Sequence, residues 1–261
     1  MSKYFGYPDY SPDGVQLVTT RDGYYKDALM DITVYRMGPG EERRFHLPED
    51  EAAFLLLEGD VEFLWEGRSE RAVRAGCFDN GAQAYALHVC KGVQVAVKAR
   101  GQSEILVQST DNEKTFDSVF YKPADIRNEI FAKDLCGGNC VRQVTTMFDY
   151  ETAPYSNMVL GEVYTRQGSW SGYPPHGHPQ PEVYYYRVDK PQGFGACFVG
   201  DDVYMIKDRS FSCLTHGLSH PQVTAPGYQI YTVWMIRHFP GDPWTDRIEL
   251  PEHKWLYDAK F

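Results

Sequence analysis

Histidine and glutamate residues gather in one short segment of the second half of the chain. The segment reads His176-Gly-His178-Pro-Gln-Pro-Glu182, and His220 follows later. Residues two apart in a strand point to the same side, so His176 and His178 can project together, and Glu182 has the same parity although two prolines interrupt the path. Imidazoles with one carboxylate suit Zn, Mn, Fe or Ni and leave positions open for substrate or water. Although a lone histidine is usually an ordinary residue, this spacing predicts one divalent-metal site at His176, His178, Glu182 and His220.

The other histidines and the cysteines give weaker signals. Cys136 and Cys140 could form half of a zinc site, but no second cysteine pair accompanies them, which favours loop or core thiols. Without a secretion signal, the six cysteines are expected to be reduced. In the first half His46 and His88 stand apart from any H-x-H motif, so we expect a loop and a strand histidine and no metal there.

Alternating apolar residues and regularly spaced turn signals predict many short strands. Within 52–65, Glu58-Gly59-Asp60 predicts a hairpin between two strands, and a short helix or turn is expected near 124–133. The polar stretch before and around this last segment predicts a boundary between two domains, 1–125 and 126–261. Strands of this kind are typical of a sandwich or barrel, and they are expected at 30–37, 93–99, 104–108, 141–148, 158–165, 182–188, 195–199, 202–206, 211–214 and 228–236.

Charge and hydropathy exclude several classes of partner. The net charge is −10 and no run rich in Lys and Arg occurs, which argues against a nucleic-acid partner. The first residues lack the apolar core of a signal peptide, and the apolar runs are too short to span a bilayer. The expectation is a cytoplasmic protein without a membrane partner.

The paired motif H-x-H-x3-E and, further along, G-x2-H resembles the metal motifs of the cupin superfamily. This resemblance implies an all-β chain of two cupin barrels, a bicupin, in which the C-terminal barrel carries the metal and the N-terminal barrel is metal-free. It also assigns the four ligands named above. The chain departs from the family pattern at Trp170, Thr215 and Thr224, where the family has Gly, Pro and Asn. Those positions shape turns.

Three stretches of the second half, 162–178, 182–195 and 220–228, are similar to bacterial 5-deoxy-glucuronate isomerases of inositol breakdown. The chain differs from them at Arg166 and Ser169, where Pro and Asn are expected, and in a shorter spacer between His178 and Glu182. A sister group, the 4-deoxy-5-keto-uronate isomerases of pectin breakdown, shares the ligand set. The first half matches only loosely.

The resemblance implies an aldose–ketose isomerisation of a small sugar acid, with 5-deoxy-glucuronate converted to 2-deoxy-5-keto-gluconate as the first choice. A divalent ion would polarise the carbonyl and stabilise the enediolate. The base could be Glu182 or a metal-bound hydroxide. Tyr184 or Tyr186 could donate a proton, because alternation places both on the side of Glu182.

A cation is needed for the substrate carboxylate, and the planar guanidinium of arginine binds carboxylates through two hydrogen bonds. Arg187 is ranked first because it follows the ligand strand, ahead of Arg166 and Arg142. Trp170 and Tyr173 precede the histidines and are candidates for the pocket mouth, although plain packing is the favoured explanation. His216 could orient a metal ligand or be an exposed turn residue.

Other functions fit the same residues. An iron-dependent cupin dioxygenase uses a similar ligand set, and a non-catalytic sugar-binding bicupin would bind without turnover. Unpaired edge strands and the high tyrosine content favour a homo-oligomer. The metal, the particular deoxy-uronate and the number of subunits are left open.

Overall fold

A computed structural model describes residues 2–260 of the chain. In this part of the chain the backbone forms two compact units. The N-terminal unit contains residues 8–126 and 147–158, and the C-terminal unit contains residues 2–7, 127–146 and 159–260. The predicted division at 125/126 differs from this one because residues 2–7 and 147–158 each group with the other half. The first exchange follows from pairing: Phe5 and Gly6 add a strand to a sheet of the C-terminal unit.

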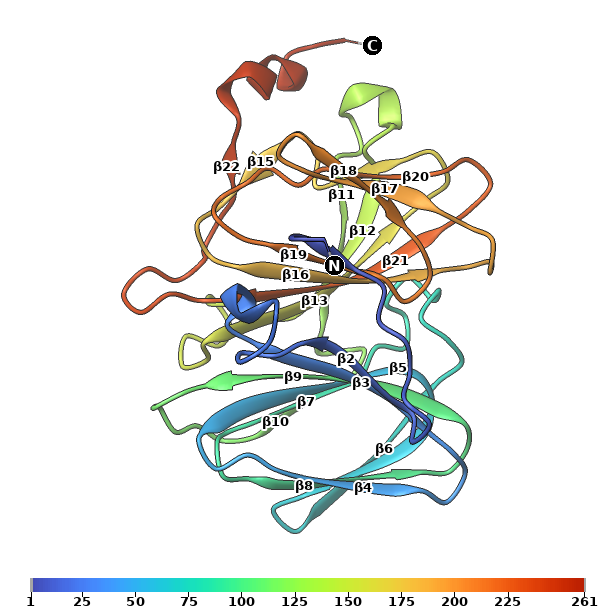
Figure 1. Ribbon diagram of the computed structural model, residues 1–261, viewed down its shortest axis with the longest axis vertical. Helices are drawn as coiled ribbons and strands as arrows, with labels where there is room; N and C mark the ends of the chain where they lie inside the picture. Colours follow the sequence, from blue (N-terminus) through green and yellow to red (C-terminus); the bar gives the residue numbers. More distant parts are fainter. Residues whose placement is uncertain (1, 261) are drawn as a thin grey trace. The chain divides into compact units, whose positions relative to one another are not determined.

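The N-terminal unit is a curled sheet folded into two layers, as Figure 1 shows. Along the main path the strand order is β10-β7-β5-β9-β3-β2, while β6 and β8 pair with β5, and β4 pairs with β8. The elements are β2 (Val15–Thr19), η1 (Lys26–Ala28), β3 (Asp31–Met37), β4 (Glu42–His46), β5 (Asp50–Trp65), β6 (Arg68–Arg74), β7 (Ala86–Val89), β8 (Gln94–Ala99), β9 (Ser103–Asp111) and β10 (Val119–Tyr121).

Strand β5 corrects the predicted hairpin within 52–65, because this segment is one continuous strand. Its first part pairs with β7 and β9, and its last part pairs with β6 and β8. A shift of register between Leu56 and Glu58 marks the point where the strand passes from one layer to the other. Gly59 has a φ of +118°, and a Cβ there would lie 2.6 Å from the Cα of Ser103. The glycine therefore bends the strand and does not reverse it.

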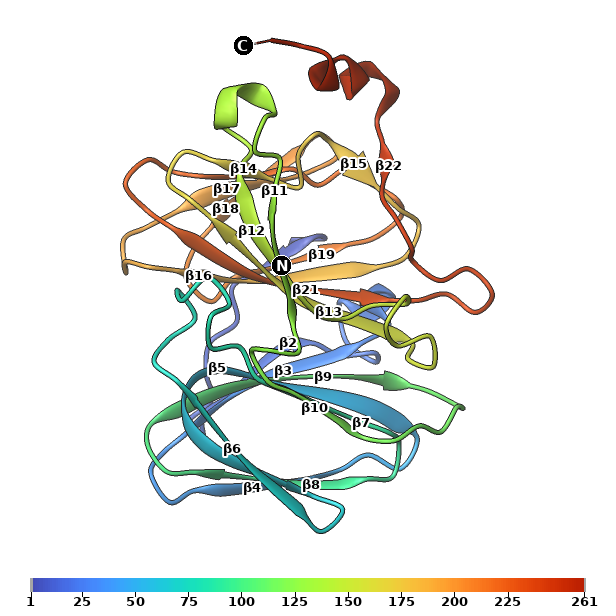
Figure 2. The same ribbon diagram turned by 180° about the vertical axis from the view of Figure 1, so that it is seen from behind.

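The C-terminal unit contains a seven-stranded sheet of order β1-β19-β16-β21-β13-β12-β11, a four-stranded sheet β14-β20-β17-β18 and the pair β15-β22, as Figure 2 shows from behind. Its elements are β1 (Phe5–Gly6), β11 (Arg127–Phe131), η2 (Cys136–Gly138), β12 (Arg142–Phe148), β13 (Met158–Thr165), β14 (Trp170–Ser171), β15 (His176–Gly177), β16 (Glu182–Val188), β17 (Gly195–Val199), β18 (Asp202–Ile206), β19 (Phe211–Leu214), β20 (Gln222–Thr224), β21 (Ile230–Arg237), β22 (Ile248–Glu249) and η3 (Pro251–Tyr257).

The segment 124–133, for which a short helix or turn was expected, has turns at both ends but forms strand β11 between them. Its residues pair with β12 in an antiparallel register that sets Asn128 opposite Thr145. The side chain of Asn128 also accepts hydrogen bonds from Gln143 and Thr145. Pairing with a neighbouring strand has overridden the weak local preference.

The core of the C-terminal unit lies between its two larger sheets. Tyr184, Tyr186 and Val188 of β16 pack there against Cys197 and other buried residues of the four-stranded sheet. Alternation along β16 puts Glu182 on this same inner side of the sheet. Among residues 2–260, no helix is long and apolar enough to cross a membrane.

Replacing Gly59 by Ala is expected to destabilise the protein by about 1–3 kcal/mol, because a Cβ would collide with Ser103 at a positive φ. Thermal unfolding monitored by circular dichroism would measure the loss. Gly76→Ala is the matched control, since a Cβ at Gly76 meets no atom within 4 Å. Equal unfolding temperatures for the two variants would show that β5 does not need glycine at its bend.

Candidate metal centre

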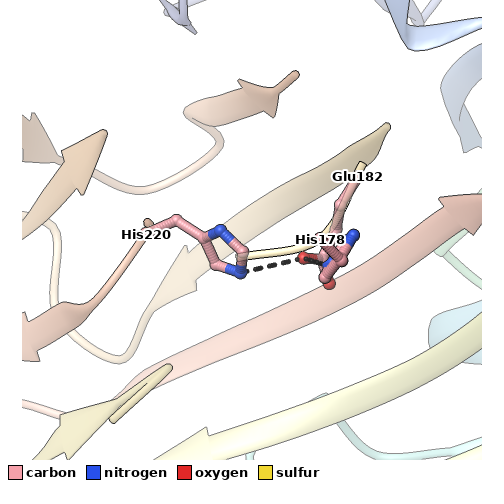
Figure 3. Close-up of side chains that lie close together, drawn as sticks. All are labelled: His178, Glu182 and His220. Atoms are coloured by element: carbon pink, nitrogen blue, oxygen red, sulfur yellow. Dashed lines mark hydrogen bonds and ion pairs between the residues drawn. The ribbon is translucent and has the colours of Figure 1, made fainter. Parts of the chain in front are cut away.

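Three of the four predicted ligands converge in the C-terminal unit. His178 follows β15, Glu182 begins β16, and His220 lies between β19 and β20. The Nε2 atoms of His178 and His220 both lie 3.2 Å from Oε2 of Glu182, and Figure 3 shows the three side chains pointing toward one another. One ligand atom from each lies within 4.8 Å of the others, and all three side chains are buried. The group has the size and composition of a site for one cation.

Gly177 explains how the two histidine segments come so close. A Cβ at this position would lie 2.5 Å from the carbonyl oxygen of Gly217, in the turn that precedes His220. That turn contains two consecutive positive φ angles, 65° at His216 and 71° at Gly217. The central glycine of the H-x-H motif thus makes room for the turn that delivers the third imidazole.

Each imidazole at this site is fixed by a hydrogen bond from Nδ1 to a backbone carbonyl two residues away. His176 bonds to Pro174 at 2.8 Å, His178 to Gln180 at 2.9 Å, and His220 to Leu218 at 2.9 Å. A carbonyl oxygen can only accept, so Nδ1 carries the hydrogen in each ring. In the neutral ring, Nε2 then presents a lone pair, which is the form that binds metals.

The inner faces of these groups fit a cation. Nε2 of His220 is buried without a hydrogen bond of acceptable geometry, although it lies at ion-pair distance from Glu182. Burial alone would raise the pKa of Glu182, but His178 and His220 lower it to about 2. This lowering holds while both rings carry a hydrogen on Nε2 and donate to the carboxylate. When each ring is neutral with its hydrogen on Nδ1, two lone pairs face the carboxylate instead. A positive ion among these atoms would satisfy all of them.

His176 lies beside this group and not within it. Its ring centroid is 5.2 Å from that of His220, and its backbone pairs with Glu249 of β22. Burial, together with the charge of His220, lowers the pKa of His176 to about 3, so its imidazole is neutral at physiological pH. Its assignment as the fourth ligand stays a prediction.

The structure separates the two tyrosines that were candidates for proton donation. The ring of Tyr184 lies 5.8 Å from that of His220. Burial, the charge of Glu182 and a hydrogen bond with Glu182 raise the pKa of Tyr184 well above 10. Tyr186 lies deeper, where its hydroxyl forms a 2.9 Å hydrogen bond with Ser212. Tyr184 is thus the tyrosine at the ligand group.

Two predicted substrate-binding arginines are elsewhere. Arg187 donates to Asp208 at 2.9 Å and, by alternation, lies on the side of β16 opposite Glu182. Arg166 is exposed, in the turn after β13. The structure does not bring either of them to the ligand group.

The predicted mouth residues form an aromatic cluster of their own. Trp170 lies 5.4 Å from Tyr173 and stacks on Phe198 at 5.7 Å, both measured between ring centroids. Both Trp170 and Tyr173 are half-buried. His216, the possible orienting residue, is exposed and lines a pocket of about 430 Å³ with Gly177, His178, Pro179, Gly217, Ile248 and Leu250.

Sequence reasoning missed two tryptophans near the ligands. The ring of Trp244 lies 6.0 Å from that of His178 and 5.8 Å from that of Trp234. The indole N–H groups of Trp234 and Trp244 are buried without a hydrogen-bond partner among the described residues. The sequence offers no spacing signal for them, because each is distant from the motif along the chain.

The N-terminal unit holds a different buried polar group. Oε2 of Glu51 lies 2.8 Å from Nε2 of His88 and accepts a 2.9 Å hydrogen bond from Ser156. The ring of His88 stacks on Phe148 with centroids 4.2 Å apart. Glu51 alternates away from the core residues of β5, whereas Glu182 alternates with the core residues of β16. Glu51, near the start of β5, and Glu182, at the start of β16, are therefore placed differently relative to the core.

Comparison with known proteins gives a family and a fold. The model of the KduI/IolB family matches residues 9–256. A 5-deoxy-glucuronate isomerase of Geobacillus kaustophilus is 25% identical over 244 residues, covering 87% of this chain and 85% of the relative. An isomerase of the same name from Shouchella clausii is 40% identical over 116 residues, 39% of this chain and 42% of the relative.

Solved structures confirm the all-β double-cupin fold. An IolB-like protein from Salmonella typhimurium LT2 has a TM-score of 0.86 at 20% identity, covering 97% of this chain and 99% of its own. An oxalate decarboxylase from Lactobacillus farciminis, a cupin, has a TM-score of 0.69 at 12% identity, covering 100% of this chain and 91% of its own. With the fold, the family model and the named relatives in agreement, the expected isomerase class is confirmed, and the chain belongs to the KduI/IolB family.

Proposed function

We propose that this protein is a metal-dependent aldose–ketose isomerase that converts 5-deoxy-glucuronate to 2-deoxy-5-keto-gluconate in inositol breakdown. The names of its relatives support the substrate. The observation that carries the metal dependence is the buried convergence of His178, Glu182 and His220 on one small volume. A role in pectin breakdown, on a 4-deoxy-5-keto-uronate, is the alternative within the same reaction class.

His178, Glu182 and His220 would hold the divalent ion, with His176 as the neighbouring fourth donor. Such an ion, when bound, supplies a Lewis acid that polarises the substrate carbonyl and stabilises negative charge on its oxygen. The carbonyl hydrogen bonds at Nδ1 keep the histidines in one orientation for this task. Zn, Mn, Fe and Ni all suit this donor set.

The proton transfers of an isomerisation need an acid and a base near the substrate. The ordinary pKa of a tyrosine already keeps Tyr184 protonated at neutral pH, and its raised pKa favours donation of a hydrogen bond, with the proton passing to a developing alkoxide that is more basic still. Glu182 is a weak base because its pKa is lowered to about 2. We therefore assign Glu182 to holding the ion and Tyr184 to the substrate oxygen. Burial of both side chains excludes bulk water from this exchange.

Location and assembly complete the proposal. We place the enzyme in the cytoplasm as a homo-oligomer, following its composition and its exposed apolar strand residues. Val203 and Met205 of the sheet-edge strand β18 are 57% and 51% exposed, which is consistent with a covered edge in an assembly.

Removing any one of His178, Glu182 or His220 is expected to lower metal affinity by more than about tenfold, because loss of an outer partner of a ligand alone costs about 10–100-fold. The variants are His178→Ala, Glu182→Gln and His220→Ala. Metal content after dialysis against zinc or manganese would be measured by inductively coupled plasma mass spectrometry. His46→Ala is the matched control, since His46 is exposed and belongs to the N-terminal unit, outside the converging group.

Retention of a full equivalent of metal by all three variants would contradict the assignment. A parallel measurement on His176→Ala tests the fourth donor. Weakened binding supports His176 as a ligand, and unchanged binding restricts the ligand set to the three converging residues.

Tyr184→Phe is expected to lower kcat by about a hundredfold while metal content stays the same, because general acid catalysis contributes about 10²–10⁴-fold. The assay follows 5-deoxy-glucuronate by proton NMR with metal-loaded protein in deuterated water. Tyr186→Phe is the control, since its hydroxyl bonds to Ser212 away from the ligands. Its kcat is expected to change much less.

Three outcomes would redirect the proposal. Absence of a ketone product with loaded wild-type protein would overturn the substrate, and the 4-deoxy-5-keto-uronate would be tested next. Substrate-dependent oxygen uptake would indicate a dioxygenase. Equal losses in the two tyrosine variants would remove the special role of Tyr184.

A further inference from the structure

Arg142 is a buried cation without an acidic partner. It is 6% exposed, and its Nη1 donates to the carbonyl oxygen of Cys140 at 3.1 Å. Its guanidinium carbon lies 6.0 Å from the ring centre of Phe131. Among the described residues, no carboxylate lies within ion-pair distance of Arg142. A buried charge left in this state costs free energy, so such groups normally have a counter-charge.

Arg142 is directed to the inner side of the C-terminal barrel. Alternation along β12 puts Arg142 on the same side as Val144, and Val144 packs against the core cluster that contains Tyr184 and Trp234. The charges of Arg142 and Tyr184 also act on each other. The guanidinium therefore shares an interior with the proton donor of the proposed reaction.

A second guanidinium belongs to Arg247, the residue immediately before β22, which pairs with His176 and Gly177. Its positive charge lowers the pKa values of both Arg142 and His176, although burial is the larger cause for each. Arg247 contacts Glu249 through Nε at 3.3 Å. Arg142 and Arg247, with the single carboxylate that contacts Arg247, carry one positive charge in excess.

We propose that Arg142 and Arg247 form the subsite that binds the carboxylate of the sugar-acid substrate. The carboxylate would supply the counter-charge that Arg142 lacks, and arginine offers the planar pair of donors that suits it. The buried indole N–H groups of Trp234 and Trp244 are further donors available to a polar ligand. This subsite replaces Arg187 and Arg166, the arginines favoured by sequence, with one buried and one half-buried cation.

The identity of the substrate that brings this carboxylate rests on the proposed function. Binding of a carboxylate at the subsite, however, can be measured without catalysis. Binding of a sugar acid that is not the substrate therefore tests it separately. We would measure affinities for glucuronate, glucose and glucose 6-phosphate by isothermal titration calorimetry with metal-loaded protein. Wild-type protein is expected to bind glucuronate at least about tenfold more tightly than glucose, a difference of about 1.4 kcal/mol.

Arg142→Met is expected to remove this preference by weakening glucuronate binding about tenfold or more and leaving the weak glucose binding unchanged. Arg142→Lys retains the charge and guards against failure to fold. Its affinity for glucuronate should lie between those of wild type and Arg142→Met. Arg247→Met should act in the same direction, and Arg166→Met, at an exposed arginine, is the matched control and should behave as wild type.

Unchanged discrimination between glucuronate and glucose in folded, metal-loaded Arg142→Met and Arg142→Lys would overturn the proposal. So would a loss of preference in Arg166→Met alone. Tighter binding of glucose 6-phosphate than of glucuronate would overturn the carboxylate as the ligand class. In a further outcome, Arg142→Met loses the preference for glucuronate over glucose while the wild-type protein gives no ketone product in the NMR assay. This pair of results would support the subsite and reject only the proposed substrate.

Discussion

Three hydrogen bonds from imidazole Nδ1 to backbone carbonyls set the chemistry of the candidate site. Each bond joins a ring to a carbonyl only two residues away. The local backbone of Pro174–Gln180 and Leu218–His220 therefore fixes the orientation of each imidazole. With Nδ1 committed to donation, Nε2 of each neutral ring must turn an electron pair inward. Glu182 then stands between His178 and His220, and the group has a surplus of acceptors that only a positive species can satisfy.

The two larger sheets of the C-terminal barrel set the position of Tyr184 and of the His220 turn relative to Glu182. Strand β16 is buried along its whole length, and its inner side carries Glu182 and Tyr184 in succession. Glu182, proposed to hold the ion, and Tyr184, proposed to donate a proton, are therefore neighbours on the same side of the strand. The turn that carries His220 approaches from the other side, and the space at Gly177 decides how near it comes.

The sequence allowed the fold class, most strands and the three side chains that converge to be predicted, since period-two alternation and the H-x-H-x3-E spacing are local signals. Strands β16 to β19 fall at the predicted limits. The hairpin at Gly59 was wrong because a glycine at a strong bend and a glycine in a turn look alike in one dimension. Arg187 was favoured for its position after Glu182, but it lies five positions further along the strand, an odd offset, so the two side chains face opposite sides of the sheet. Arg142 was ranked below Arg187, and only the tertiary structure shows that Arg142 is buried without a carboxylate partner in the described part of the chain.

The cation Arg247 lies outside the strands of the two larger sheets, on a tail attached through the two-residue strand β22 beside His176. The residues proposed as metal ligands, by contrast, lie within 176–220, a stretch that also contains strands β15 to β19 of the barrel. A segment held by so short a pairing can change in sequence and length with little strain on the barrel. Within the family, changes in the segment that carries Arg247 would therefore alter which sugar acid is bound, while the residues proposed for the isomerisation stay the same. Substrate range and reaction type could then evolve independently of each other.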